Sequence, residues 1–266
     1  MNQKSVLIGA DPELFVAHEG KVSSAIGLIG GTKDRPRWVD LGALQEDNVL
    51  LEFNVDPAGD SGEFIRNIRS VIGTARDVLS DFKREIVQDL SSHSFSQDEL
   101  ESFGKPAFVF GCDPDFNAWT RKVNPKPAAA DPGLRTAGGH LHIGYDHIQE
   151  VNPVLNTNII RMCDYRLGLP SVLMDKDDRR RELYGKGGAM RHKSYGPEYR
   201  TLSNFWLNSD ELIAWAFQGA KESYEKVEEL EGFLQVVSGE EVQRIINTND
   251  KVAAKQACDA LGVRYA

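Results

Sequence analysis

The chain has 266 residues, 41% of them hydrophobic, which is enough for one large domain with a continuous core and argues against a disordered or fibrous protein. Its 31 Lys and Arg residues against 40 Asp and Glu residues give a formal net charge of -9, so strong nonspecific binding to nucleic acid or to an anionic membrane is not expected. The three cysteines are not spaced as a disulfide framework or a zinc site, which favours a reducing cytoplasm. No signal peptide or membrane span is expected, because Asp11 and Glu13 interrupt the short apolar run near the N-terminus.

The first part of the sequence predicts short strands. They are expected over residues 5–8, 14–18, 22–25 and 49–55, with a hairpin turn at 18–21. In the last of these strands Val49, Leu51 and Phe53 share one face, whereas Glu52 and Asn54 share the other. The polar face of this strand is the first indication of a functional surface.

A long amphipathic helix is expected next. From Asp60 to about Gln88 the apolar residues recur at intervals of three and four, and Asp60 followed by Glu63 is typical of a capping box. Residues 107–110 predict a strand, and the Pro- and Asn-rich stretch 114–131 predicts an irregular loop.

The second half of the sequence alternates strands and helices without a regular β-α-β repeat. A strand is expected where Leu141, Ile143 and Tyr145 alternate with polar or small residues. A helix over 154–167 is expected to end at Gly168 and Pro170, a strand should cover 199–202, and helices should predominate from Ser209. The predicted fold class is therefore α+β with a largely antiparallel sheet, in one domain over residues 1–266.

Four places in the sequence carry two polar or ionisable residues at positions i and i+2. Such residues project from the same face of a strand, so four strands side by side would form a polar floor. A solvated sheet face also alternates, but solvated faces favour Lys, Thr and Glu rather than carboxylates and imidazoles beside glycine-rich turns. The four pairs are Asp11 and Glu13, Glu52 and Asn54, His140 and His142, and Glu198 and Arg200.

These residue types indicate a divalent metal. Several carboxylates on one floor repel one another unless cations neutralise them, and Asp, Glu and His are the side chains that ligate such cations. The His-x-His pair alone is a weak signal, because it also occurs in zinc hydrolases, cupins and satisfied cores. The number of carboxylates exceeds what a zinc site needs, which favours Mg2+ or Mn2+.

The segment 175–200 is both basic and glycine-rich. A basic run is most often a solvated loop, but this one ends at Glu198 and Arg200, so its guanidinium groups lie within reach of the floor. Metal-bridged phosphates held by arginine are what phosphoryl transfer from ATP requires. Neither a Walker motif nor a Rossmann glycine fingerprint is present, so the nucleotide would be held in another way.

The strings GADPELFV, EDNVLLEFNVDPA, LRTAGGHLHIGY, ELYGKGGAMR and YGPEYRTLSNFW resemble the phage-type amidoligase family, within the carboxylate-amine ligase superfamily of glutamine synthetase and glutamate-cysteine ligase. The resemblance spans roughly residues 5–210 and leaves the helices from about 209 as generic. It implies a curved, largely antiparallel sheet with helices packed on one face, which binds ATP and Mg2+ or Mn2+. It also implies that a substrate carboxylate is phosphorylated and that an amine then displaces the phosphate.

The resemblance assigns roles to individual residues. It implies that the metal ligands are Asp11, Glu13, Glu52, His140 and Glu198, with Asp47 a weaker candidate. Many members of the superfamily have Glu where this chain has Asp11. The residues expected at the nucleotide are His142, Tyr184, Lys186 and Arg179. Arg200 is expected to hold phosphate or the substrate carboxylate, and the expected transition-state clamps are Arg181 and Arg191.

The loop before the histidine strand supplies candidates for substrate selection. Asp113, Asp115 and Trp119 either select the acid or the amine or form a turn with ordinary packing. Cys112 is expected to be a small core residue, because no base is assigned to it. The expected partners are a small-molecule or peptide carboxylate and an amine acceptor in the cytoplasm, which is the host cytoplasm for a phage protein, and a homo-oligomer is compatible with the sequence.

Two alternatives stay open from the sequence. A metal-dependent amide or peptide hydrolase would use the same acids and histidines to activate water, although it needs no clamp for a triphosphate. A catalytically inactive phage accessory or binding protein would keep the fold, although it has no need of the intact set of acidic residues, His140 and Arg200.

Overall fold

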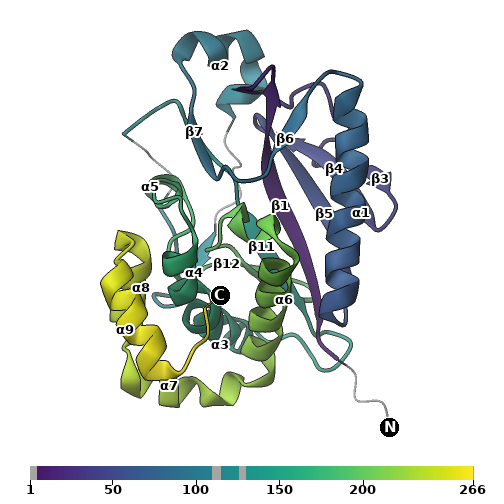
Figure 1. The fold of residues 1–266 in the computed structure, drawn as a ribbon. Helices are drawn as coiled ribbons and strands as arrows, with labels where there is room; N and C mark the ends of the chain where they lie inside the picture. The colour runs from purple at the N-terminus through teal and green to yellow at the C-terminus, as the bar shows by residue number, and fades with distance from the viewer. Residues whose placement is uncertain (1–4, 110–114, 126–129, 266) are drawn as a thin grey trace.

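The computed structural model describes residues 5–109, 115–125 and 130–265 (Figure 1). Within these ranges no helix combines the length and the apolar character needed to cross a bilayer. Cys112 and Asp113 lie outside the described residues.

One large antiparallel sheet dominates the described part of the chain. Its eleven strands are β1 (Leu7–His18), β2 (Lys21–Ser23), β3 (Arg37–Val39), β4 (Gly42–Asp47), β5 (Leu50–Ala58), β6 (Glu85–Val87), β8 (Phe116–Asn117), β9 (Lys122–Val123), β11 (Gly139–Gly144), β12 (Ala189–Lys193) and β13 (Gly196–Tyr199). The order across the sheet is β3-β4-β5-β1-β11-β13-β12-β8-β9, and β2 and β6 pair with the far end of β1. A separate ribbon joins β7 (Ser92–Ser94) to β10 (Leu134–Thr136).

Helices cover the apolar face of this sheet and extend into a C-terminal group. They are α1 (Ser61–Ser80), α2 (Gln97–Phe103), α3 (Pro153–Cys163), α4 (Leu169–Met174), α5 (Arg180–Leu183), α6 (Asp210–Glu225), α7 (Leu230–Val236), α8 (Gly239–Thr248) and α9 (Lys251–Leu261). In Figure 1, α1 runs along β4 and β5, α6 lies over β1 and β11, and α7 to α9 group with α4 at the opposite side. The α+β class with a large antiparallel sheet is confirmed.

Alternation along the central strands explains which face the helices cover. Ile8, Ala10 and Leu14 of β1 are buried in the main core, where Phe64 of α1 stacks on Trp206 with ring centroids 6.0 Å apart. The odd-numbered residues of β1 point to the other side of the sheet and include both acidic residues of the strand. Burial of one face by helices therefore leaves the opposite face free for polar side chains.

The two strands predicted over 5–8 and 14–18 are one continuous strand. β1 runs through Pro12, because β5 and β11 pair with it on both sides, and the Glu13 N–H donates to the Gly138 carbonyl at 2.9 Å directly after the proline. The prediction of two separate strands was wrong, since pairing on both flanks tolerates the one backbone donor that Pro12 lacks. The hairpin turn after His18 is confirmed.

The predicted helix from 60 to 88 is shorter than expected. Asp60 caps α1, because its Oδ1 accepts from the Glu63 N–H at 2.9 Å. The predicted capping box is incomplete, because the Glu63 side chain accepts from the Gly59 N–H at 3.0 Å instead of from Asp60. The helix ends at Ser80, and Lys83, with a φ of 54°, turns the chain into β6. Ile86, at a helical interval from the preceding apolar residues, therefore lies in a strand opposite Val16.

Three other expectations differ from the structure. Residues 105–108 form a 3-10 helix in place of the strand predicted over 107–110. The chain does not leave the helix at Gly168, because a π turn (Asp164–Gly168) connects α3 directly to α4 and Pro170 lies in the first turn of α4, where no backbone donor is needed. The strand predicted over 199–202 ends at Tyr199, and helices begin after Ser209 as expected.

Candidate active site

The four predicted pairs lie on four neighbouring strands, β5, β1, β11 and β13, or directly beside them. The register places Asp11 opposite His140, Glu13 opposite Glu52, and His142 opposite Glu198. Arg200 follows β13 by one residue, and its N–H donates to the Ala189 carbonyl at 3.0 Å. The prediction that these residues share one floor is confirmed by the register.

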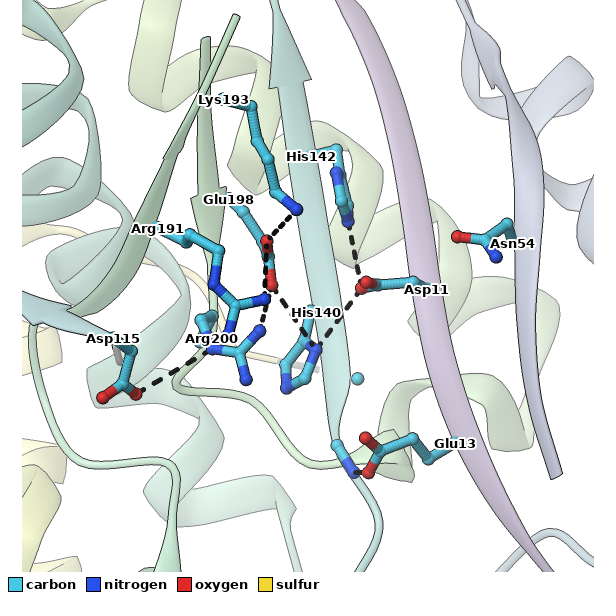
Figure 2. Close-up of polar contacts among 12 residues, drawn as sticks. Asp11, Glu13, Asn54, Asp115, His140, His142, Arg191, Lys193, Glu198 and Arg200 are labelled. Atoms are coloured by element: carbon cyan, nitrogen blue, oxygen red, sulfur yellow. Dashed lines mark hydrogen bonds and ion pairs between the residues drawn. The ribbon is translucent and has the colours of Figure 1, made fainter. Parts of the chain in front are cut away.

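Asp11, His142 and Glu198 form the centre of this floor, and we call them the central triad (Figure 2). One ligand atom from each lies within 4.8 Å of the other two. Asp11 Oδ1 is 3.0 Å from His142 Nε2 and 3.3 Å from His140 Nδ1, which is in turn 3.8 Å from Glu198 Oε1. Donor atoms from three adjacent strands therefore converge on one point.

The buried polar atoms at this point are partnered mainly by the other ionisable groups of the floor. Asp11 Oδ1 and His142 Nε2 are buried, and they lie 3.0 Å apart without the geometry of a good hydrogen bond, while Glu198 Oε2 is buried beside Lys193 Nζ. Two carboxylates and an imidazole that converge in this way fit the ligand set of a divalent cation. The proximity of Asp11 also raises the pKa of His142 against the opposing effect of burial.

Basic side chains surround Glu198, which has no exposed surface. Lys193 Nζ lies 2.9 Å from Glu198 Oε2, Arg191 Nη1 lies 3.7 Å from it, and Arg200 forms an ion pair with Oε1. Arg200 Nε also lies 3.9 Å from Asp115. Burial and Asp11 would raise the pKa of Glu198, but Arg200 and the histidines outweigh them and hold it at about 2.

A second acidic group lies further along the floor, at Glu13, Glu52 and Asp47. Glu13 Oε2 accepts from the Gly138 N–H at 2.6 Å, and Figure 2 shows Glu13 apart from the central triad. Burial, with a contribution from Asp47, raises the pKa of Glu13 to about 7. Burial and the charges of Asp11 and Glu13 raise the pKa of Glu52 well above its usual value.

The basic segment places Arg180, and not Arg181, beside the floor. Arg180 is buried, donates to the carbonyls of Thr201 at 3.0 Å and Arg200 at 3.3 Å, and interacts electrostatically with Glu13. Arg181 instead donates to Ser171 Oγ and to Asn249 Oδ1, both at 3.1 Å, so it faces the C-terminal helices. The sequence offered three consecutive arginines but no means of choosing among them.

Of the other residues predicted to bind the nucleotide, one lies beside the floor and two do not. Tyr184 is half-buried, and burial together with Glu13 and Asp47 raises its pKa to about 12, which places it beside the second acidic group. Arg179 lies elsewhere, donating to Ser94 at 2.8 Å and to Asp131 at 3.0 Å. Lys186 is exposed.

A pocket that the sequence did not predict lies beyond His142 on the same face. Its volume is about 320 Å³. Two glycines line it, Gly9 and Gly144, which lie two residues from Asp11 and His142 along β1 and β11. A Cβ atom at either glycine would point into contact with residues of the pocket at 3.6 Å or more. The other lining residues are Leu7, Ala10, Asn54, Val55, Pro57, Asp146, His147 and Tyr195.

Comparison with known proteins bears on the same residues. Residues 132–259 match the family described as Phage phiEco32-like COOH.NH2 ligase-type 2. A solved structure described as "Crystal structure of novel glutamine synthase homolog" aligns with a TM-score of 0.38 and 13% identity, covering 96% of this chain and 67% of that chain. A search of curated proteins found no match.

The matched range includes the His140 and His142 strand, the basic segment, Glu198 and Arg200, and it extends through α6 to α8 into α9. The resemblance indicated by the motifs had stopped near residue 210, whereas the family match continues into the C-terminal helices. The resemblance to the phage-type ligases is confirmed over residues 132–259, which match the model of the Phage phiEco32-like COOH.NH2 ligase-type 2 family.

Proposed function

We propose that the chain is an ATP-dependent carboxylate-amine ligase that works through an acyl phosphate. One observation carries the proposal: the floor that gathers Asp11, His142 and Glu198 also places Lys193, Arg191 and Arg200 directly beside them. Ligands for a divalent cation next to a group of fixed positive charges meet the two main requirements of phosphoryl transfer. The family match over residues 132–259 supports the same reaction class.

The central triad would hold the first Mg2+ or Mn2+ ion. Two carboxylates and one imidazole suit such an ion, and one ligand atom from each lies within 4.8 Å of the other two. His142 therefore moves from the expected nucleotide contact to a metal ligand, while His140 remains a candidate through its 3.3 Å separation from Asp11. A bound divalent ion supplies charge neutralisation for phosphate oxygens.

Glu13 and Glu52, with Asp47 close by, are the residues that we propose for a second ion. Burial and repulsion from neighbouring carboxylates raise the pKa of both glutamates, so a cation would favour their ionised forms. Arg180 is the only basic side chain of the three-arginine run that the described contacts place near this end of the floor. We propose that it takes the role expected of Arg181, which is to stabilise negative charge in the transition state.

The pocket beyond His142 would receive the base and sugar of ATP. It adjoins the central triad through His142 and is lined mainly by aliphatic and glycine residues, with Tyr195 at its side. A nucleotide seated there would direct its phosphates toward Lys193, Arg191 and Arg200. These cations stabilise negative charge on the phosphoryl group during transfer.

The proposed reaction has two steps, phosphorylation of the acid and attack by the amine. A carboxylate oxygen of the acid substrate attacks the γ-phosphorus of ATP, and the bond from that phosphorus to the ADP oxygen breaks. The amine nitrogen then attacks the acyl carbon, inorganic phosphate leaves with the electron pair of the acyl–oxygen bond, and the nitrogen loses a proton. Arg200 and Arg191 act on the first step, because each is close to Glu198 and carries a fixed positive charge.

The function is tested by ADP formation with pools of carboxylic acids and amines, followed by mass spectrometry of the products. We expect ADP release that requires both pools and a divalent metal, and a product mass equal to acid plus amine minus water. The control is Arg244→Ala, which removes an exposed ion pair with Glu241 far from the floor. Cleavage of amides without ATP would contradict the proposal and favour the hydrolase.

A further inference from the structure

Asp164 is a fully buried carboxylate that lies behind the floor, on the helix side of the sheet. It begins the π turn between α3 and α4, in which the Leu169 N–H donates to the Asp164 carbonyl. Its side chain has no exposed surface. A wide π turn within a helix is less favourable than a regular turn and is often retained at functional sites, so this placement requires an explanation.

The Asp164 carboxylate gathers hydrogen bonds from three segments of the site. Oδ2 accepts from Trp119 Nε1 at 2.6 Å, and Oδ1 accepts from the Tyr199 hydroxyl at 2.9 Å. The Thr201 hydroxyl is shared between Asp164 Oδ1 at 3.3 Å and the Lys186 carbonyl at 3.1 Å. The Gly188 N–H contributes a further hydrogen bond. These donors are all neutral, and burial raises the pKa of Asp164 to about 6 while the hydrogen bonds oppose that shift.

Two of the donors are next to residues of the floor. Tyr199 stands between Glu198 and Arg200, and the alternation of the strand puts its side chain on the core side, opposite to theirs. Thr201 follows Arg200 directly. One carboxylate therefore holds, from behind, the stretch of chain that carries both a metal-ligand candidate and the main phosphate-binding candidate.

The other two donors connect Asp164 with the segment that carries Arg191 and with the segment that carries Asp115. Gly188 begins the stretch that leads through β12 to Arg191, and Trp119 lies in the loop between β8 and β9, a hairpin that Asp115, the 3.9 Å partner of Arg200, directly precedes. The packing around Asp164 depends on glycine. A Cβ atom on Gly168 would lie 2.8 Å from the Tyr199 hydroxyl, and one on Gly188 would lie 2.6 Å from Trp119 Cδ1.

We propose that Asp164 is a positioning residue of the active site, which fixes Glu198, Arg200 and the Trp119 loop relative to one another through Tyr199 and Thr201. The inference rests on the proposed function, because it concerns the same metal and phosphate residues. Outer partners of metal ligands commonly change metal affinity by a factor of about 10 to 100 when they are removed.

The test compares Mn2+ affinity by calorimetry, without nucleotide, in the wild type and in Asp164→Asn, Tyr199→Phe and Tyr165→Phe. Tyr165→Phe is the matched control, because Tyr165 is the next residue of the same π turn and its hydroxyl donates to the Val237 carbonyl at 2.5 Å, in the C-terminal part of the chain. All three variants lose buried hydrogen bonds, and circular dichroism sets a temperature at which all are folded. Tyr199→Phe supplies the test where Asp164→Asn does not fold.

We expect Asp164→Asn and Tyr199→Phe to bind Mn2+ about tenfold more weakly than Tyr165→Phe, which should match the wild type. A purely structural role would lower the melting temperatures of all three variants and leave the Mn2+ affinities equal, and that result would overturn the inference while leaving the metal site intact. Failure of the wild type itself to bind Mn2+ would overturn the proposed metal site, and the inference with it.

Discussion

Glu13 on β1 lies directly opposite Glu52 on β5, so two half-buried carboxylates face each other across neighbouring strands. Burial raises the pKa of Glu13 to about 7 and the pKa of Glu52 well above its usual value. In the absence of a cation the folded protein therefore binds protons more tightly at this position than the unfolded chain does.

Glu13 should contribute less stability to the metal-free protein as the pH rises from about 4.5 to about 7. Over this window the unfolded chain releases the Glu13 proton while the folded protein retains it, so the contribution of Glu13 to the free energy of unfolding falls by no more than about 3 kcal/mol. Glu13→Gln should remove this part of the pH dependence. Denaturant unfolding with a chelator present measures the difference between the two proteins.

Addition of Mn2+ at pH 7 should reverse the loss in the wild type, because a bound cation favours the ionised carboxylates. The variant should gain less from Mn2+ than the wild type. Parallel pH profiles for wild type and Glu13→Gln would show that Glu13 does not titrate as the geometry requires.

Glu198→Gln should weaken Mn2+ binding by about tenfold or more, because it removes a charged ligand from the central triad. It also leaves Arg200 and Lys193 without their shared counter-ion, so the melting temperature should fall. Affinity is measured by calorimetry below that temperature. Glu182→Gln, an exposed carboxylate on α5, is the control, and equal affinity in both variants would contradict the triad.

Gly144→Ala should raise the KM for ATP by about three- to tenfold with little effect on folding. The new methyl group would meet its nearest neighbour, the Leu7 carbonyl oxygen, at 3.6 Å, so it fits the strand but occupies part of the pocket. Gly73→Ala in α1 has nothing within 4 Å of the new methyl group and should only stabilise the helix. An unchanged KM in Gly144→Ala would place the nucleotide elsewhere.

Arg180→Ala and Arg181→Ala should separate activity from stability. Arg181→Ala loses buried hydrogen bonds to Ser171 and Asn249, so it should destabilise the protein by about 1 to 3 kcal/mol and leave the turnover of the folded fraction near the wild-type value. Arg180→Ala should reduce turnover by about 100-fold. Thermal melts and ADP formation, measured on the same preparations, give both numbers, and the reverse pattern would restore the original assignment of Arg181.

Local periodicity was sufficient to predict the floor but not its surroundings. The i and i+2 spacing fixed which side chains share a face, since a strand has a period of two, and this held for Asp11 with Glu13 and for His140 with His142. The end of α1 was not predictable, because Ile86 continues the helical spacing while pairing with β1 as a strand.

The direction of each arginine in the run 179–181 could not be predicted from the sequence. Successive residues of a helix point about 100° apart, so the direction of Arg180 and Arg181 depends on how α5 meets the sheet, and the sequence does not encode that angle locally. Asp164 was missed for a similar reason. A lone acid inside an apolar helical stripe was its only local signal, and its partners Trp119 and Tyr199 are distant in sequence.

Hydroxylamine trapping tests the acyl-phosphate chemistry most directly. The protein is incubated with ATP, Mg2+, a pool of amino acids and dicarboxylic acids, and hydroxylamine, which converts an acyl phosphate into a hydroxamate detectable by mass spectrometry. The wild type and Arg244→Ala should form hydroxamate only when ATP and metal are both present, and Arg200→Ala should form none although it remains folded and binds Mn2+. Hydroxamate formation by Arg200→Ala at the wild-type rate, or amide cleavage by the wild type without ATP, would contradict the ligase mechanism.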